Sequence, residues 1–327
     1  TKLAAEWPLT PSEAMMRISG TQFPVKELRN QQAEIENKDH LYRNADYVGR
    51  LELNRESQKF EFIYDNELTP IRKFPIGDNK NMPGAIVIYK HPAEDSTDDR
   101  YILGIDSYDF DESSTNSLGS CFVFDTWNNK IVAEYTGRPK ATEFYENCRR
   151  LCLYYNAIVN IEGLNKGIFD YFDKMGSGYL ICEEPRVSRE VINDPKSKGT
   201  NRRGTIPSPK QNQYARGLIA EWLLSKTNNP DKPEELQVHC LRSPALVKEL
   251  AGWNNKDNFD RVSALGMVMI LKSEKEKYNV ESEIKLTSEL IKDPHFYKVF
   301  SRNPKFRGLF NNNQVYNQLS YGGGNNL

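Results

Sequence analysis

The sequence predicts an α/β protein with a mixed β-sheet, helices on both faces of that sheet, and a small N-terminal extension. Short apolar, β-prone runs bounded by turn residues recur at 101–106, 118–124 and 131–135, which predicts hairpin-linked strands. After residue 141, segments with a helical period alternate with apolar runs at 157–161 and 179–182. Hairpin-linked strands followed by strand–helix alternation are typical of a mixed sheet.

Composition and charge exclude several classes of protein. The chain has 327 residues, 38% of them hydrophobic, which is enough for one large domain with a core, or for one domain plus a smaller appendage. Its formal net charge of -1 means that any basic, nucleic-acid-binding surface must be local. The sequence contains no run of about 18 apolar residues, so no membrane span is predicted. The five cysteines, an odd number inside apolar segments, predict free thiols in a reducing compartment.

The remaining elements follow from local patterns. Residues 1–45 read as helix and loop, with a helix start at Thr10–Ala14. Further strands are expected in an antiparallel pair within 46–64, at 85–89 and at 236–240, and helices at 141–156, around 168–172, at 211–225 and at 257–275. Residues 183–209 are predicted to form a polar loop, and 311–327 a disordered tail rich in asparagine and glycine.

Three carboxylates stand out by their position in these elements. Asp106 ends the strand at 101–106, and Glu162 follows the strand at 157–161. Asp260 lies in the first turn of the last helix, on an otherwise apolar face, so it should point at the sheet. The alternative is that Asp260 only stabilises the N-terminus of the helix through its interaction with the helix dipole, a role that suits Asp257 better.

Carboxylates that converge at one end of a sheet repel each other and bind protons unless a divalent metal ion neutralises them. Oxygen ligands without His or Cys favour Mg²⁺ or Mn²⁺ over zinc. A pair of such ions is used for phosphodiester hydrolysis, in which one activates water and the other stabilises the leaving oxygen. Asp106, Glu162 and Asp260 are therefore the candidate catalytic residues and metal ligands, with two Mg²⁺ or Mn²⁺ ions as cofactors.

The order of the motifs resembles a known family. Gly104–Asp106 (GID), Tyr155–Gly167 (YNAIVNIEGLNKG) and Phe259–Gly266 (FDRVSALG) are similar to the C-terminal nuclease domain of the large terminase subunit of tailed bacteriophages. Glu6–Ala14 (EWPLTPSEA) resembles the segment that joins the ATPase motor of that family to its nuclease. The resemblance covers roughly residues 5–275. It implies a ribonuclease-H-like fold in which an Asp, a Glu and an Asp hold the metal ions.

The resemblance also implies a function. The expectation is a metal-dependent endodeoxyribonuclease that cuts concatemeric double-stranded DNA during viral genome packaging, in the cytoplasm of the infected bacterial host. Implied partners are double-stranded DNA, the portal protein, the small terminase subunit and the protein's own ATPase motor domain, with no membrane. The expected domains are a linker from the motor (1–45), a β-rich extension (46–99), the nuclease (100–280), and a C-terminal extension with a disordered tail (281–327).

The sequence departs from the family pattern at two places. Many members carry a further Asp just before the second strand, where this chain has Asn116–Gly119. Asp109, Asp111 or Glu112 could supply that supporting ligand, and the sequence does not choose among them. A Gly-x₄-Gly-Lys-Ser/Thr phosphate loop is absent, so the chain is expected to be a nuclease-containing fragment without ATPase activity of its own.

A basic segment follows the predicted strand at 179–182. It contains no acidic residue and could bind DNA phosphates without sequence preference, or could be a solvated loop. Its cations, the candidate DNA-binding residues, are Lys196, Lys198, Arg202, Arg203 and Lys210.

Three other functions stay open from the sequence. A Holliday-junction resolvase or an integrase-like nuclease would use the same acids, and cleavage of branched DNA would separate it from a packaging nuclease. An actin-like or sugar-kinase ATPase also begins with Gly-Ile-Asp, but Asp109–Glu112 would repel a nucleotide. A non-catalytic docking module would use the acids only for structure.

Overall fold

The computed structural model describes residues 21–38, 46–73, 82–94, 100–111, 117–163, 166–192 and 202–292. The chain divides into two compact units, Thr1–Glu274 and Lys275–Leu327. The described part of the second unit is the continuation of the last helix, α10 (Asp260–Lys292). The predicted helix start at Thr10–Ala14 and the predicted disordered tail lie outside the described residues.

The first unit is built on a seven-stranded sheet of order β2-β1-β3-β6-β5-β4-β7. Strand β7 runs parallel to β4, and the other neighbouring pairs are antiparallel. The strands are β1 (Tyr47–Leu53), β2 (Phe60–Tyr64), β3 (Ile86–Ile88), β4 (Tyr101–Asp106), β5 (Gly119–Asp125), β6 (Lys130–Gly137) and β7 (Ile158–Ile161).

The order and direction of β4 to β7 confirm the predicted ribonuclease-H-like sheet. Strands β4, β5 and β6 pair antiparallel in sequence, and α5 (Ala141–Tyr155) then connects β6 to β7, which lies beside β4. Helix α5 ends at Asn156, which has a left-handed conformation (φ 50°) of the kind that stops helices. Because β4 and β7 are parallel, their C-terminal ends meet at one edge of the sheet, where open sheets hold ligands.

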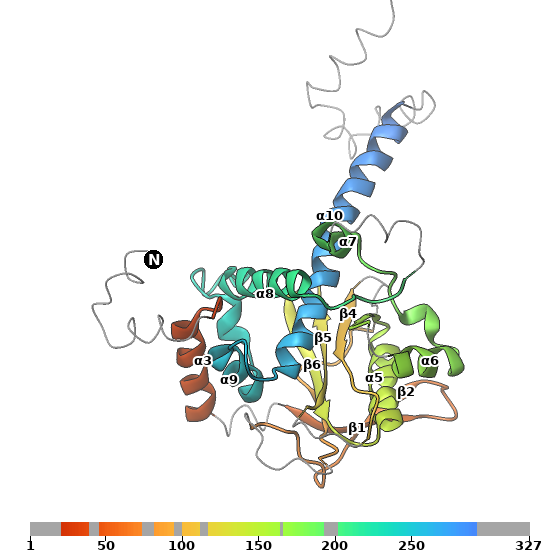
Figure 1. The fold of residues 1–327 in the computed structure, drawn as a ribbon, viewed down its shortest axis with the longest axis vertical. Helices are drawn as coiled ribbons and strands as arrows, with labels where there is room; N and C mark the ends of the chain where they lie inside the picture. Colours follow the sequence, from red (N-terminus) through yellow and green to blue (C-terminus); the bar gives the residue numbers. More distant parts are fainter. Residues whose placement is uncertain are drawn as a thin grey trace, which may run out of the picture. The chain divides into compact units, whose positions relative to one another are not determined.

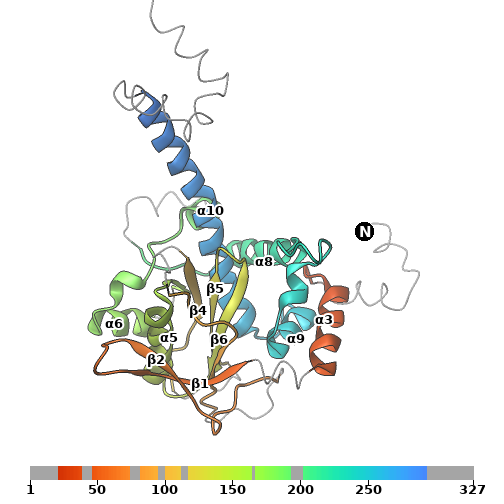
Figure 2. The ribbon, with the colours of Figure 1, turned by 180° about the vertical axis from the view of Figure 1, so that it is seen from behind.

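Helices cover both faces of this sheet, as predicted (Figures 1 and 2). One apolar cluster joins the sheet to α5 and α6 (Lys166–Lys174), and a second joins it to α3 (Val25–Asn37), α8 (Pro209–Leu224), α9 (Pro244–Gly252) and α10. Strand β4 shows the reason: Ile102 packs in the second cluster and Leu103 in the first, because successive side chains point to opposite faces.

The structure corrects two predicted strands. Residues 178–180 form a 3₁₀ helix, η1 (Gly178–Leu180), and next to it only Ile181 pairs with β7, through Val159. Tyr179 is 71% exposed, so the apolar run at 179–182 is not a buried strand. The predicted strand at 236–240 is instead the 3₁₀ helix η3 (Gln237–Cys240), which follows an isolated bridge between Lys226 and Leu236.

Two helices lie where none was predicted. Helix α7 (Arg186–Ile192) interrupts the expected polar loop, and α9 follows η3. Ser243 caps α9 by accepting a hydrogen bond from Leu246 N at 3.3 Å, and Pro244 occupies its first turn. This Ser-Pro pair is a standard helix start signal, so α9 could have been predicted from the sequence.

All five cysteines are unpaired, as the sequence predicted. The helices within the described part of the chain include none with both the length and the apolarity to cross a membrane. The strands of the proposed 46–99 extension, β1 to β3, continue the same sheet as β4 to β7.

Candidate functional site

Helix α10 packs directly on β4, and Gly104 makes this close approach possible. A Cβ atom at Gly104 would lie 2.5 Å from the backbone oxygen of Ala264 and 2.5 Å from the backbone nitrogen of Val268. Asp260 precedes Ala264 by one helical turn, and Asp106 follows Gly104 on the same face of the strand. The glycine therefore brings the two carboxylates to one end of the β4–α10 contact.

Asp106 lies at the centre of the site. The side chains of Glu162 and of Ser263 on α10 are its polar neighbours: interaction with Glu162 raises the pKa of Asp106, and interaction with Ser263 lowers it. Burial raises the pKa of Asp106 well above its usual range, and the charges of Glu162 and Asp260 raise it further. Glu162 and Asp260 therefore lie close enough to Asp106 for their charges to act on it.

Strand β7 directs Glu162 toward the same helix. Asn160, two residues earlier, is fully buried and donates from Nδ2 to the backbone oxygen of Met267 on α10 at 2.9 Å. Side chains at 160 and 162 share a face because the strand period is two. The backbone amide of Glu162 donates to Ile105 O at 3.1 Å, which ties this residue to the end of β4.

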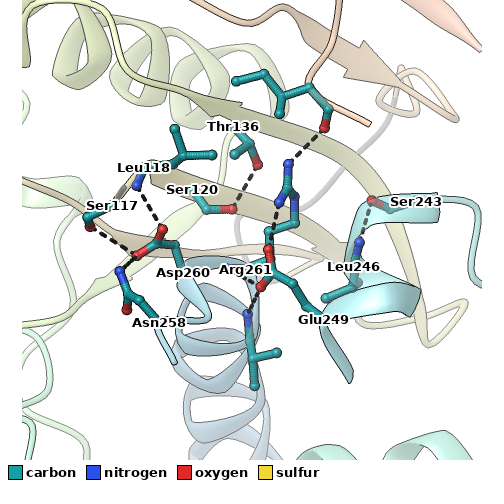
Figure 3. Close-up of polar contacts among 12 residues, drawn as sticks. Ser117, Leu118, Ser120, Thr136, Ser243, Leu246, Glu249, Asn258, Asp260 and Arg261 are labelled. Carbon is teal, nitrogen blue, oxygen red and sulfur yellow. Dashed lines mark hydrogen bonds and ion pairs between the residues drawn. The ribbon is translucent and has the colours of Figure 1, made fainter. Parts of the chain in front are cut away.

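Asp260 is 8% exposed and is held by three hydrogen bonds, two of them from the residues just before β5 (Figure 3). Its Oδ2 accepts from the backbone amide of Leu118 at 2.7 Å, and its Oδ1 accepts from Ser117 Oγ at 3.1 Å and Asn258 Nδ2 at 2.7 Å. Burial raises the pKa of Asp260, whereas these donors lower it. A carboxylate has about four acceptor positions, so one remains available on Asp260.

Glu249 on α9 fixes the first turn of α10 (Figure 3). It accepts hydrogen bonds from the backbone amides of Arg261 at 3.0 Å and Val262 at 3.3 Å, which the helix itself leaves without partners. It also pairs with the Arg261 guanidinium at 2.6 Å, and both side chains are buried. Burial raises the pKa of Glu249, and the Arg261 charge counteracts this effect. Glu249 thereby positions Asp260, the residue before Arg261.

The donors at this site fit a divalent cation. Asp106, Glu162 and Asp260 offer only hard oxygen ligands, which suits Mg²⁺ or Mn²⁺. In the described residues, no group of three or more His, Cys, Asp and Glu side chains is already arranged as a metal site. A divalent ion bound by these carboxylates would reduce the repulsion between their charges.

The other candidate ligands have different partners. Asp109 Oδ1 accepts from the hydroxyl of Tyr145 at 2.7 Å, and Asp111 Oδ1 accepts from the backbone amide of Ala141 at the start of α5, also at 2.7 Å. Both line a separate hollow of about 490 Å³ between α5 and α6. Asp111 thus serves as a helix cap, and Glu112 lies outside the described residues.

The basic segment is only partly described. Lys196 and Lys198 lie outside the described residues, and Lys210 is exposed in the first turn of α8. Arg203 already has a carboxylate partner: its two terminal nitrogens lie 2.6 and 2.7 Å from the oxygens of Asp173. Arg202, which is partly exposed, remains a candidate for phosphate binding.

Sequence reasoning missed the residues that support the three acids. Ser117 and Leu118 stand where the family often has a further Asp, and here they donate to Asp260 instead. Arg138 donates to the carbonyl oxygens of Ser117 and, at 3.0 Å, Phe110, which ties both segments to β6. No local sequence pattern predicts these contacts, because each joins residues that are far apart in the sequence.

No protein-family model matches the chain, and no curated protein matches it. Among solved structures, the chain is similar to the large terminase nuclease from thermophilic phage G20c with bound zinc, at a TM-score of 0.38 and 13% identity over 61% of this chain and 90% of that one. The forms of that nuclease with bound magnesium and with bound cobalt match at a TM-score of 0.38 and 12% identity, over 62% of this chain and 90% of the nuclease.

Proposed function

We propose that this chain is a metal-dependent endonuclease that cuts double-stranded DNA during viral genome packaging. The proposal is carried by Asp106, at one edge of a ribonuclease-H-like sheet, because the charges of both Glu162 and Asp260 act on its carboxyl group. The raised pKa of Asp106 adds support, because strongly perturbed carboxyl groups cluster at functional sites.

In this proposal, Asp106, Glu162 and Asp260 would hold the divalent ions through their carboxylate oxygens. Two divalent ions would supply an activated water and stabilise the leaving oxygen of the cleaved phosphodiester. The donors from Ser117, Leu118 and Asn258 hold Asp260 in one orientation, which keeps the ligand geometry ready before the substrate arrives.

The remaining expectations belong to the same proposal. Concatemeric viral DNA in the bacterial cytoplasm is the proposed substrate. Of the five cations predicted to bind DNA, Arg202 and Lys210, with Lys196 and Lys198, are the proposed phosphate ligands, while Arg203 is paired with Asp173. The ATPase motor, the portal protein and the small terminase subunit are the proposed partners. The domain boundaries at 45, 99 and 280 stay predictions.

The decisive experiment is cleavage of supercoiled plasmid by the purified chain with Mg²⁺, with Mn²⁺ and with EDTA. We expect nicked and linear products with either metal and none with EDTA. Asp106→Asn should abolish cleavage, whereas Asp231→Asn, which removes an exposed carboxylate, should cut like the parent. A four-way junction in the same assay tests the resolvase alternative, which would be favoured by preferential cutting at the branch.

Two results would contradict the proposal. Cleavage that survives Asp106→Asn would show that the three acids do not hold the catalytic metal. A folded parent that neither cleaves DNA nor gains thermal stability with Mg²⁺ or Mn²⁺ would favour the docking-module alternative.

A further inference from the structure

A polar hollow of about 260 Å³ opens beside Glu162, between α8, α10 and the segment 253–259. Glu162 forms part of its wall, so the hollow is continuous with the candidate catalytic site. The other charged side chains on its wall are Arg216 from α8 and Asp257. Four amides also line it, from Asn212, Asn254, Asn255 and Asn258.

Among the described residues, Arg216 has no polar partner in this hollow. Its guanidinium carbon lies 4.4 Å from the centre of the Trp253 ring, a stacked cation–π arrangement. Its Nε is shielded from solvent and has no hydrogen-bond acceptor among the described residues. Burial lowers the pKa of Arg216, which is the cost of partly removing the cation from water.

The nearby acid does not neutralise this cation. Asp257 Oδ2 accepts a hydrogen bond from Asn254 Nδ2 at 2.8 Å, and no ion pair joins Asp257 to Arg216 in the described structure. Glu162 faces Asp106. The N–H donors of a guanidinium lie in the plane of the group. An arginine whose flat face contacts an aromatic ring can therefore still donate to two oxygens of a phosphate.

We propose that Arg216 and the surrounding asparagine amides bind a backbone phosphate of the DNA strand that is cut, close to the scissile phosphodiester. The inference rests on the proposed nuclease function and adds a phosphate subsite to it. Stacking on Trp253 fixes the guanidinium before DNA binds, so little side-chain entropy is lost on binding. Amide donors complete the subsite without adding charge.

A phosphate is favoured over a flipped base as the occupant. The face of Trp253 that opens toward Arg216 is already covered by the guanidinium, and Phe23 and Phe259 pack against the same ring system at centroid distances of 6.2 and 6.3 Å. Three side chains thus already contact the Trp253 ring, which leaves less of it available for a base to stack on.

The test is DNA binding by fluorescence anisotropy over a range of salt concentrations, with Ca²⁺ in place of Mg²⁺ to suppress cleavage. Arg216→Ala should weaken binding of a short duplex about tenfold, the effect of losing one charge-assisted contact. The slope of log affinity against log salt should become shallower by about 0.9. Arg216→Lys should recover the slope but only part of the affinity, because lysine keeps the charge without the fork.

Two further variants separate the subsite from general effects. Arg55→Ala removes an exposed cation from the β1–β2 turn and should bind like the parent. Asn255→Asp places a negative charge at an exposed position of the hollow without touching the Arg216–Trp253 stack, and should also weaken binding. If the melting temperature shows that Arg216→Ala is unfolded, Asn255→Asp alone tests the subsite.

The outcomes distinguish this inference from the proposed function. If the parent cleaves plasmid but Arg216→Ala and Asn255→Asp both bind like Arg55→Ala, the subsite is wrong and the nuclease stands. Weaker binding with an unchanged salt slope would overturn the phosphate in favour of a base. A parent that binds no DNA in Ca²⁺ would overturn the inference as well. If the parent does not cleave DNA, but Arg216→Ala binds DNA more weakly than the parent and with a shallower salt slope, the phosphate subsite is supported and the nuclease function is not.

Discussion

The backbone of α10 lies against Gly104 of β4 so closely that a Cβ atom at this glycine would be 2.5 Å from the carbonyl oxygen of Ala264. The contact is between two backbones, so no side-chain rotation can relieve it. It also sets the distance between the strand that ends in Asp106 and the helix that begins with Asp260.

Gly104→Ala should therefore reduce both stability and cleavage. Forcing a methyl group into this contact should cost about 1–3 kcal/mol of unfolding free energy. Activity should fall further than the loss of folded protein explains, because the two aspartates move apart. Gly217→Ala is the matched control: no atom lies within 4 Å of its added Cβ, and alanine in a helix should add about 0.5–1 kcal/mol. Urea unfolding and plasmid cleavage would measure both effects.

Asp106→Asn should raise the melting temperature in metal-free buffer at neutral pH. The pKa of Asp106 is higher in the folded state than in the unfolded one, so the folded protein holds the extra proton. The stability from this group is then complete below its unfolded pKa, near 3.8, and is lost as the pH rises through the raised value. Asp106→Asn cannot ionise, so its stability should not fall with rising pH in this way.

Added metal should reverse the order of the melting temperatures of the parent and Asp106→Asn. Mg²⁺ or Mn²⁺ should raise the melting temperature of the parent and leave that of Asp106→Asn nearly unchanged. Differential scanning fluorimetry at several pH values would measure this. A variant that melts far below the parent without metal would show that Asp106 is a structural acid.

Ser117→Ala should slow cleavage without unfolding the protein. The change removes the 3.1 Å hydrogen bond to Asp260 Oδ1 but leaves the Leu118 amide in place. Loss of a residue that orients a metal ligand typically costs roughly 10- to 100-fold in activity or metal affinity. Cleavage rates against Mg²⁺ concentration would show a higher metal requirement, and Ser57→Ala, at an exposed turn, should be unaffected.

Glu249→Gln should destabilise the protein by about 3–5 kcal/mol, the usual cost of breaking a buried ion pair. Arg261 would keep its bond to Ile71 O at 2.7 Å but lose its only carboxylate partner among the described residues. Chemical unfolding would measure the loss. A paired Glu249→Leu, Arg261→Met variant should recover stability, because neither charge remains buried, yet cleave poorly, because the first amides of α10 lose their acceptor. Full activity of that double variant would contradict the positioning role of Glu249.

Arg202→Ala and Arg203→Ala should differ in their effect on DNA binding. Arg203 is paired with Asp173, so its removal should change the salt dependence little. Arg202 has no such ion pair in the described structure, and each phosphate contact it makes should contribute about 0.9 to the salt slope. Anisotropy titrations in Ca²⁺ would compare them. Equal slopes for Arg202→Ala and the parent would mean that this segment does not meet DNA.

Local sequence patterns were sufficient to predict most of the sheet. Apolar runs bounded by turn residues located β4, β5, β6 and β7, and the helical period located α5, because strands and helices impose periods of two and 3.6 on buried residues. The same reasoning failed at 179–182 and 236–240, where short apolar runs form 3₁₀ helices. Such runs are too short for their period to distinguish the two structures.

The sequence by itself determined which carboxylates end β4, follow β7 and begin α10, because each position depends on residues within a few places of it. Only the tertiary structure decided what surrounds them. The amide of Leu118 reaches Asp260 across 142 positions, Glu249 caps α10 from another helix, and Arg216 meets Trp253 across a hollow. These contacts join segments that approach only when α8, α9 and α10 pack on one face of the sheet, and so they leave no local period in the sequence.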